Sequence, residues 1–263
     1  MTYSESFVTS ASGHGDGLAP FCAIDHVAGA MQQVKTIEAG PDFRHVDVWI
    51  FDLDNTLYPA KSGVFAQIEA RITLFVQRLL GLGFDEARRV QKSYYRDHGT
   101  TMNGLMRRHA VDPEDYLAFV HDIDLSAIPG DAALGDALAR LPGRRFVFTN
   151  GCRHHARRVL DRLALCDRFD DVLDIRTTEF RPKPDPDSYR TVLAHIAASP
   201  AQSALFDDIP RNLVPAHALG FTTVWLKNES LWSKQGPNTP QVSPGQIDYE
   251  TEDLCSFLGQ VRV

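Results

Sequence analysis

Residues 48–57, with the sequence VWIFDLDNTL, decide the fold of this chain because an apolar run ends in two carboxylates one residue apart. The run predicts a buried strand. In an open parallel sheet, ligands bind beyond the carboxyl ends of the strands, so Asp52 and Asp54 would lie in the mouth of a site. The alternative is a strand followed by a turn whose Asp and Asn side chains hydrogen-bond to nearby backbone.

Four further strand-like segments follow this one along the chain. The first strand is expected at 46–51 and the others at 146–148, 172–175, 204–206 and 222–226. Helical patterns fall between most of them. Strands that alternate with helices predict an α/β fold, in which right-handed crossovers build a Rossmann-like, doubly wound parallel sheet.

The gap between the first two strands is too long for a single crossover and indicates an inserted helical domain. Apolar residues recur there at helical spacing, which predicts helices at 64–80, 85–97, 102–110 and 113–123. A helix at 131–141 would lead back into the sheet, and a short one at 252–258 would close the chain. The expected domains are a poorly ordered extension at 1–44, a core at 45–61 and 126–263, and the insertion at 62–125.

Composition narrows the class of protein. The 263 residues are 43% hydrophobic, which is enough for one good core. A net charge of -7 argues against a nucleic-acid polymer as the main partner. The apolar runs are shorter than the roughly 20 residues of a membrane helix, and the amino end lacks the layout of a secretion signal. We therefore expect a soluble, cytoplasmic protein.

The cysteines and one histidine pair could suggest a metal or redox site. Cys22, Cys152, Cys166 and Cys255 are widely scattered, so free thiols are expected. His154 and His155 are adjacent, and neighbours on a helix point about 100° apart, which seldom suits one ion. This pattern favours solvated helix residues.

Polar residues follow three of the predicted strands at their carboxyl ends. They are Asp52 and Asp54, then Thr149–Gly151, then Asp207–Asp208. Parallel strands would bring all three groups to one edge of the sheet. Lys183 follows a fourth strand, and the prolines on both sides of it stiffen the backbone that carries its ammonium group.

The charges at this edge predict a cation and an anionic substrate. Asp52, Asp54, Asp207 and Asp208 would repel one another by ~4 kcal/mol per close pair, and Lys183 offsets only part of this repulsion. An all-oxygen ligand set is typical of Mg²⁺, which often bridges to phosphate. Asp52, Asp208 and the backbone carbonyl of Asp54 are the expected metal ligands.

The same residues suit phosphoryl transfer from a small phosphorylated substrate. Asp52 would attack phosphorus and form an aspartyl-phosphate. Asp54 would protonate the leaving oxygen and then accept a proton from water. The Thr149 hydroxyl, the backbone N–H groups of 150–151 and Lys183 would bind the phosphoryl oxygens.

Each motif alone has a simpler interpretation. Thr149–Gly151 could be an ordinary turn at the end of a strand, Lys183 a solvated loop lysine, and Asp207–Asp208 the cap of the next helix. All of them in this order, and at strand ends, favour a functional site.

With these four motifs assembled, the chain resembles the haloacid dehalogenase-like (HAD) hydrolase superfamily over about residues 46–226. The resemblance implies a Rossmann-like core, Mg²⁺, an aspartyl-phosphate intermediate and a helical cap inserted after the first motif. The dehalogenase branch lacks an acid at the position of Asp54, so phosphoryl transfer is preferred to carbon–halogen cleavage. Asn212 stands where a second acid is frequent, and we expect it, with Asp207, to support the metal ligands.

Two segments are similar to the pyrimidine 5′-nucleotidase branch, namely FDLDNTLYP at 51–59 and SYYRDHG at 93–99 with Gly-Leu at 104–105. The resemblance implies hydrolysis of UMP or CMP beneath the cap. Tyr94 or Tyr95 would stack on the base, and His98, Asn103 or Arg107 would meet its polar edge. Packing against other cap helices is the alternative for the tyrosines.

Three hypotheses for the function follow. The first is a Mg²⁺-dependent phosphatase of pyrimidine 5′-nucleotides. The second is a sugar-phosphate phosphatase or a phosphomutase on the same scaffold. The third is a non-catalytic regulator or scaffold protein, against which the intact acid pair argues.

Overall fold

The computed structural model describes residues 40–228, 243 and 245–263. Most of the extension predicted at 1–44 therefore lies outside the described residues. The last residues of that extension pack on the core. The Phe43 side chain is fully buried and stacks on Trp49, with 5.5 Å between the ring centroids. The backbone N–H of Phe43 donates to the Arg262 carbonyl, so this segment lies beside the end of the chain.

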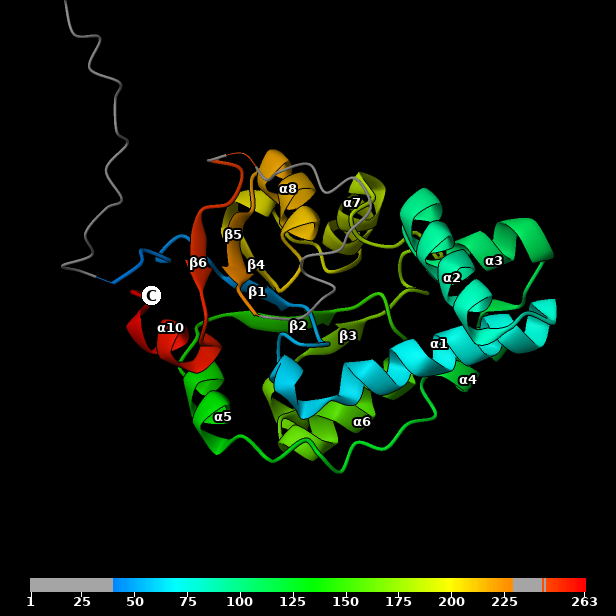
Figure 1. Cartoon of the computed structure of the whole chain (residues 1–263). Helices are drawn as coiled ribbons and strands as arrows, with labels where there is room; N and C mark the ends of the chain where they lie inside the picture. The colour runs from blue at the N-terminus through cyan, green and yellow to red at the C-terminus, as the bar shows by residue number, and fades with distance from the viewer. Residues whose placement is uncertain (1–39, 229–242, 244) are drawn as a thin grey trace, which may run out of the picture. The chain divides into compact units, whose positions relative to one another are not determined.

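In the described part of the chain, six parallel strands form one sheet in the order β3-β2-β1-β4-β5-β6 (Figure 1). The strands are β1 (Val48–Phe51), β2 (Arg144–Phe148), β3 (Asp171–Leu173), β4 (Ser203–Asp207), β5 (Thr222–Leu226) and β6 (Tyr249–Thr251). The chain adds β2 and β3 on one side of β1 and then crosses to β4 on the other. The strand order thus reverses between β1 and β4, which is where open α/β sheets bind ligands.

Helices cover both faces of the sheet (Figure 1). They are α5 (Ala132–Ala139), α6 (Arg153–Leu163), α7 (Pro186–His195), α8 (Pro210–Leu219) and α10 (Leu254–Gln260), with short 3-10 turns η1 (Ala60–Ser62), η2 (Cys166–Arg168) and η3 (Pro200–Gln202). Trp49 and Phe51 of β1 pack in the cluster that contains α5, α6 and α10, whereas Val48 and Ile50 pack in the cluster that contains α7 and α8. This alternation is the two-residue period of a strand buried on both faces.

Four helices lie in the sequence between β1 and α5, and we call them the helical insertion. They are α1 (Val64–Leu80), α2 (Phe84–His98), α3 (Thr101–His109) and α4 (Pro113–Val120). Local signals set their ends. Gly81 ends α1 with a φ of 67°, and the Asp112 side chain caps α4, which has Pro113 in its first turn. Most members of a third apolar cluster lie in the insertion, among them Val76, Leu105 and Leu117, and Cys152 and Ile175 of the core join it.

The parallel α/β sheet predicted from the sequence is confirmed. The sequence patterns missed β6, and they placed the closing helix two residues early. None of the helices in the described residues is both long and apolar enough to cross a bilayer. Cys152, Cys166 and Cys255 are free, and Cys22 lies outside the described residues.

Candidate active site

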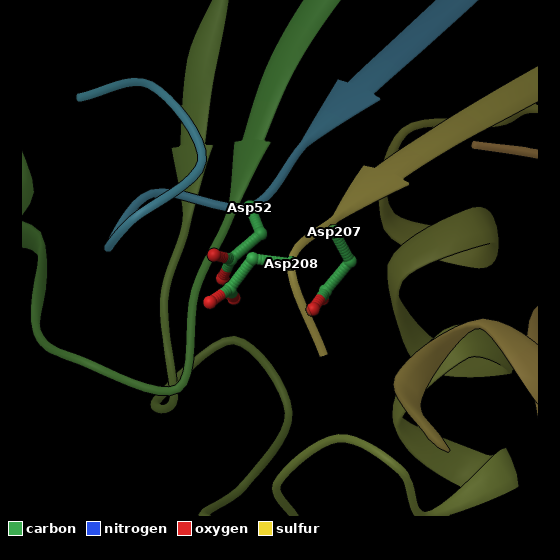
Figure 2. Close-up of side chains that lie close together, drawn as sticks. All are labelled: Asp52, Asp207 and Asp208. Carbon is green, nitrogen blue, oxygen red and sulfur yellow. The ribbon is translucent and has the colours of Figure 1, made fainter. Parts of the chain in front are cut away.

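Three carboxylates meet where the strand order reverses. Asp52 follows β1, Asp207 is the last residue of β4, and Asp208 follows it. Oxygen atoms of all three lie within 4.8 Å of one another, and the groups are at most 8% exposed. Figure 2 shows Asp52 and Asp208 beyond the ends of their strands, with Asp207 beside them. The backbone N–H of Asp52 donates to Phe206 at 2.8 Å, which fixes the two strand ends to each other.

Lys183 is the cation of this cluster. Its side chain is 1% exposed, and Nζ donates to Asp52 Oδ1 at 2.8 Å, to Asp207 Oδ2 at 2.7 Å and to the Phe148 carbonyl at 2.9 Å. These three acceptors use all three protons of the ammonium group. Burial alone would lower the pKa of Lys183, but Asp207 and Asp52 outweigh it and raise that pKa. Lys183 is therefore charged at neutral pH.

Asn150 holds the Lys183 segment in place. Its side-chain oxygen accepts the Lys183 N–H at 2.8 Å, and its amide nitrogen donates to the Lys183 carbonyl at 3.1 Å. Because the side chain of Asn150 makes these two hydrogen bonds, its predicted contact with the substrate would come from its backbone N–H. Thr149 is buried beside the acids, and its hydroxyl accepts the N–H of Gly151 at 2.9 Å. Thr149, Asn150 and Gly151 line the cavity that also contains Asp52.

Asn212 and Asp207, which were expected to support the metal ligands, are hydrogen-bonded to each other. The Asn212 amide donates to both oxygens of Asp207, at 3.0 and 3.1 Å, and the Ile209 N–H donates to Oδ1 at 2.8 Å. Lys183 donates to Oδ2, so both carboxylate oxygens of Asp207 already have hydrogen-bond partners. The carboxylate of Asp208 accepts one hydrogen bond within the described residues, from the side-chain amide of Asn228 at 3.0 Å.

The surroundings of Asp54 differ from those of the other acids. Its Oδ1 accepts the Tyr58 hydroxyl at 2.6 Å and pairs with His155 Nε2 at 2.8 Å. Burial raises the pKa of Asp54, but His155 and Tyr58 outweigh it, and the pKa lies below its usual range. Asp54 is therefore ionised in the free protein.

The donor set suits a hard divalent cation. Burial raises the pKa of Asp52 to about 7, even though Lys183 opposes the shift. Burial and the nearby charge of Asp52 raise the pKa of Asp208 well above its usual range. The single ammonium group of Lys183 therefore does not neutralise these carboxylates. A hard divalent cation such as Mg²⁺ would supply the missing positive charge, because such cations bind to oxygen ligands.

Apart from the residues named above, most of the lining of the cavity that contains Asp52 comes from the helical insertion. Its side chains there are mainly apolar, among them Phe65, Ile68, Ile72, Met102, Leu117 and Val120. Tyr95 of α2 also lines the cavity, and Arg211 of α8 lies over its ring, with Cζ 4.3 Å from the centroid. Burial raises the pKa of Tyr95 although the charge of Arg211 opposes the shift, and the charge of Asp208 adds to it.

Tyr94 and three polar candidates lie elsewhere. Tyr94 packs within the insertion, where its hydroxyl pairs with His109 at 2.7 Å and its ring lies against Gly104. His98, Asn103 and Arg107 line a different cavity, next to the loop that carries Pro182 and Pro184. Of the residues expected to meet a base, only Tyr95 lies beside the acids.

His155 corrects one expectation. His154 is exposed as predicted, but His155 is fully buried and bonded to Asp54. The signal was present in the sequence, because His155 lies on the apolar stripe of α6 with Ala156, Val159 and Leu163. His121, which follows α4 and stacks on His155, had no comparable signal.

The comparisons with known proteins agree with this geometry. The sequence model of the haloacid dehalogenase-like hydrolases matches residues 46–220. The chain belongs to this family. The match covers all four motifs and the whole helical insertion, so this hydrolase carries the family's motifs from β1 to the end of α8.

Two curated relatives of this hydrolase are phosphate-related proteins. It is 28% identical to Phosphate metabolism protein 8 of Saccharomyces cerevisiae over 74% of this chain and 68% of the yeast protein. It is 29% identical to Validoxylamine A 7′-phosphate phosphatase of Streptomyces hygroscopicus subsp. limoneus over 68% of this chain and 84% of that enzyme.

Solved structures share the fold at low sequence identity. A HAD phosphatase from Thermococcus onnurineus superposes with a TM-score of 0.52 at 19% identity, covering 83% of this chain and 100% of that one. The HAD hydrolase YfnB from Bacillus subtilis, whose structure holds magnesium, superposes with a TM-score of 0.51 at 17% identity over 81% of this chain and 97% of its own. The hydrolase thus has the HAD fold.

Proposed function

We propose that this hydrolase is a Mg²⁺-dependent phosphomonoesterase whose substrates are pyrimidine nucleoside 5′-monophosphates. The carrying observation is the position of Asp52, which lies between Lys183 and Asp208 and two residues from the hydrogen-bonded carboxylate of Asp54. A nucleophile, a cation and an acid–base group then surround one space. The phosphatase relative supports a phosphate ester as substrate.

In the first step, one Asp52 oxygen attacks phosphorus while the bond from phosphorus to the ester oxygen breaks. The leaving oxygen takes a proton from Asp54. Asp54 takes up that proton from solvent when the dianionic phosphate arrives, because a neighbouring like charge disfavours the ionised carboxylate. The Thr56 hydroxyl, which donates to Asp52 Oδ2 at 3.0 Å, orients the nucleophile.

In the second step, water attacks the aspartyl-phosphate and Asp54 takes its proton. The acyl-phosphate bond from Asp52 to phosphorus breaks, and inorganic phosphate leaves with Asp52 restored. Asp54 is available for this step, because it has just given its proton to the leaving oxygen, and its Oδ1 stays held by Tyr58 and His155. Lys183 and the N–H groups that follow Thr149 offset charge on the phosphoryl oxygens in both steps.

The metal site would use Asp52, Asp208 and the backbone carbonyl of Asp54. Mg²⁺ bound there would supply positive charge for the phosphoryl oxygens. Asp207 is occupied by Lys183 and Asn212, which leaves it to hold Lys183 in place.

The helical insertion would act as a cap over the acids. We propose domain bounds of 62–125 for this cap and of 45–61 with 126–263 for the core. The apolar lining that it contributes suits a planar base and not a polyhydroxylated sugar. Tyr95, backed by Arg211, offers the aromatic face on which a pyrimidine would stack.

A panel of phosphomonoesters, assayed for free phosphate with and without chelator, tests the proposal. We expect release from UMP and CMP that depends on Mg²⁺ and exceeds release from sugar phosphates. No release from any ester would reject the phosphatase. Magnesium-independent release would reject the metal ligands.

A second candidate is a phosphatase of sugar-like phosphates. It is favoured by the relative from Streptomyces hygroscopicus subsp. limoneus, which is named for a phosphate ester of validoxylamine A. The same panel separates the two, because brisk release from sugar phosphates without release from UMP or CMP would retain the class and replace the substrate.

A further inference from the structure

We infer that His155 is a positioning residue that aims Asp54 at the leaving group of the substrate. The inference rests on the proposed function, because it concerns how the acid–base group of that reaction is held. His155 lies on α6, 101 residues along the chain from Asp54, and its Nε2 is 2.8 Å from Asp54 Oδ1. Helix α6 belongs to the core, so His155 and Asp54 both come from the core.

Both hydrogen bonds to Asp54 fall on the same oxygen. Tyr58 and His155 approach Oδ1 at 2.6 and 2.8 Å, while Oδ2 accepts no hydrogen bond within the described part of the chain. Asp54 also lines the cavity that contains Asp52. One oxygen is thus anchored, which leaves the other to exchange a proton with the substrate and then with water.

The other nitrogen of His155 indicates why an imidazole stands here. Nδ1 is buried and has no hydrogen-bond partner in the described residues. An unpartnered buried polar atom costs roughly 1–3 kcal/mol. An apolar side chain at this fully buried position would avoid that cost, so the bond to Asp54 is the polar contact that the imidazole provides. A proton on Nε2 is what the bond needs, because the ionised carboxylate of Asp54 can only accept.

The ring of His155 is held from one side by His121. The two imidazoles are parallel within 6°, with centroids 4.4 Å apart. Cys152 Sγ pairs with His121 Nδ1 at 3.2 Å, and Arg158 donates to the His121 carbonyl at 2.9 Å. Cys152, His155 and Arg158 are spaced three residues apart, so one face of α6 positions both rings.

A comparison of two substrates distinguishes a loss of Asp54 positioning from a general loss of activity. The alkoxide that leaves UMP needs a proton, whereas p-nitrophenolate is a stable anion and leaves without one. The ratio kcat/KM reports the steps up to release of the leaving group, and a general acid contributes about 10²–10⁴-fold there. A misaimed Asp54 therefore slows UMP much more than p-nitrophenyl phosphate.

The experiment compares His155→Leu, which fills the site without a donor, with His155→Gln, whose amide reaches the position of Nε2. We expect His155→Leu to lower kcat/KM for UMP about 100-fold and for p-nitrophenyl phosphate by less than about 5-fold. His155→Gln should restore most of the loss. Val159→Ala, one turn along the same buried face, is the control and should leave the ratio between substrates unchanged.

Thermal unfolding of each variant shows whether it is folded. If His155→Leu does not fold, His155→Asn takes its place, because its shorter amide reaches only the position of Nδ1. Equal losses on the two esters, or no loss on either, overturn the positioning role while the phosphatase stands. Wild-type protein that hydrolyses neither ester overturns the proposed function and this inference with it.

Discussion

The carboxyl edge of the sheet and the helical insertion face the same cavity with opposite chemistry. At the edge, Lys183 contacts Asp52 and Asp207 within 2.8 Å, and Asn150 and Asn212 hold these groups by further hydrogen bonds. The insertion instead contributes mainly apolar side chains to the cavity. Charged groups that must keep one geometry are held by several partners each, whereas an apolar wall needs only to fit.

This difference suggests that the chemical step and the choice of substrate are carried by separate regions. Except for variants that misaim Asp54, whose effect depends on the leaving group, changes at the edge should lower activity on every ester, and changes in the insertion should change the ranking among esters.

Asp52→Asn should lower kcat on every phosphomonoester by roughly 10⁴-fold or more, because the amide cannot act as the nucleophile. Folding should be kept, since burial already raises the pKa of Asp52 to about 7 and a neutral side chain is tolerated there. Phosphate release and thermal unfolding in chelator are the measurements. Asp47→Asn, the same change at the exposed opposite end of β1, is the control. Retained activity in Asp52→Asn would remove Asp52 from its role.

Lys183→Met should lower stability by about 3–5 kcal/mol at pH 7, because Asp52 and Asp207 lose the ammonium group between them. Activity should also fall on all esters alike. Denaturant unfolding measures the first effect, and Lys61→Met, on an exposed residue, is the control. A stability change below about 1 kcal/mol, the range of exposed ion pairs, would show that the buried network contributes little.

His121 lies where the insertion meets the core, and its ionisation should make folding sensitive to acid. Burial, with His155 contributing, lowers the pKa of His121 to about 3. The unfolded chain binds this proton near pH 6.5, so the stability that His121 contributes is complete above that pH and is lost as pH falls towards 3. From pH 7 to pH 5 this one group should remove about 2 kcal/mol.

Urea unfolding of His121→Phe, which keeps a stacking ring, measures that contribution by difference. The variant should lose about 2 kcal/mol less than the wild type between pH 7 and pH 5. Parallel losses in the two proteins would mean that the His121 ring is not buried in its neutral form.

The edge of the sheet was largely predictable from the sequence, because buried strands deliver consecutive polar residues to one side. Asp52, Thr149 and Asp208 each follow a strand pattern closely, and Lys183 comes later in the segment after another strand. The structure places all four on one cavity. Strand β6 was missed because it is three residues long and half exposed, and among the described strands it pairs with β5 alone.

The contacts that aim the side chains were not predictable, because they join distant segments. His155 reaches Asp54 across 101 residues, and Asn150 binds the backbone of Lys183 across 33. Local spacing carries no information on such pairs. Nor could it separate Tyr95 from Tyr94, which are neighbours on α2 but lie in different surroundings.

Tyr95 and its neighbour Tyr94 provide the mildest and most specific test of the division between edge and insertion. Tyr95→Ala should lower kcat/KM for UMP about 10-fold, since one base–aromatic stack contributes ~1–3 kcal/mol. Glycerol phosphate, which has no ring, should react within about 2-fold of the wild-type rate, because the acids and Lys183 are untouched. Tyr94→Ala is the matched control, because Tyr94 packs inside the insertion and should affect both esters equally. Equal losses on UMP and glycerol phosphate in Tyr95→Ala would mean that the insertion supports the chemistry itself, and the two regions would then act as one.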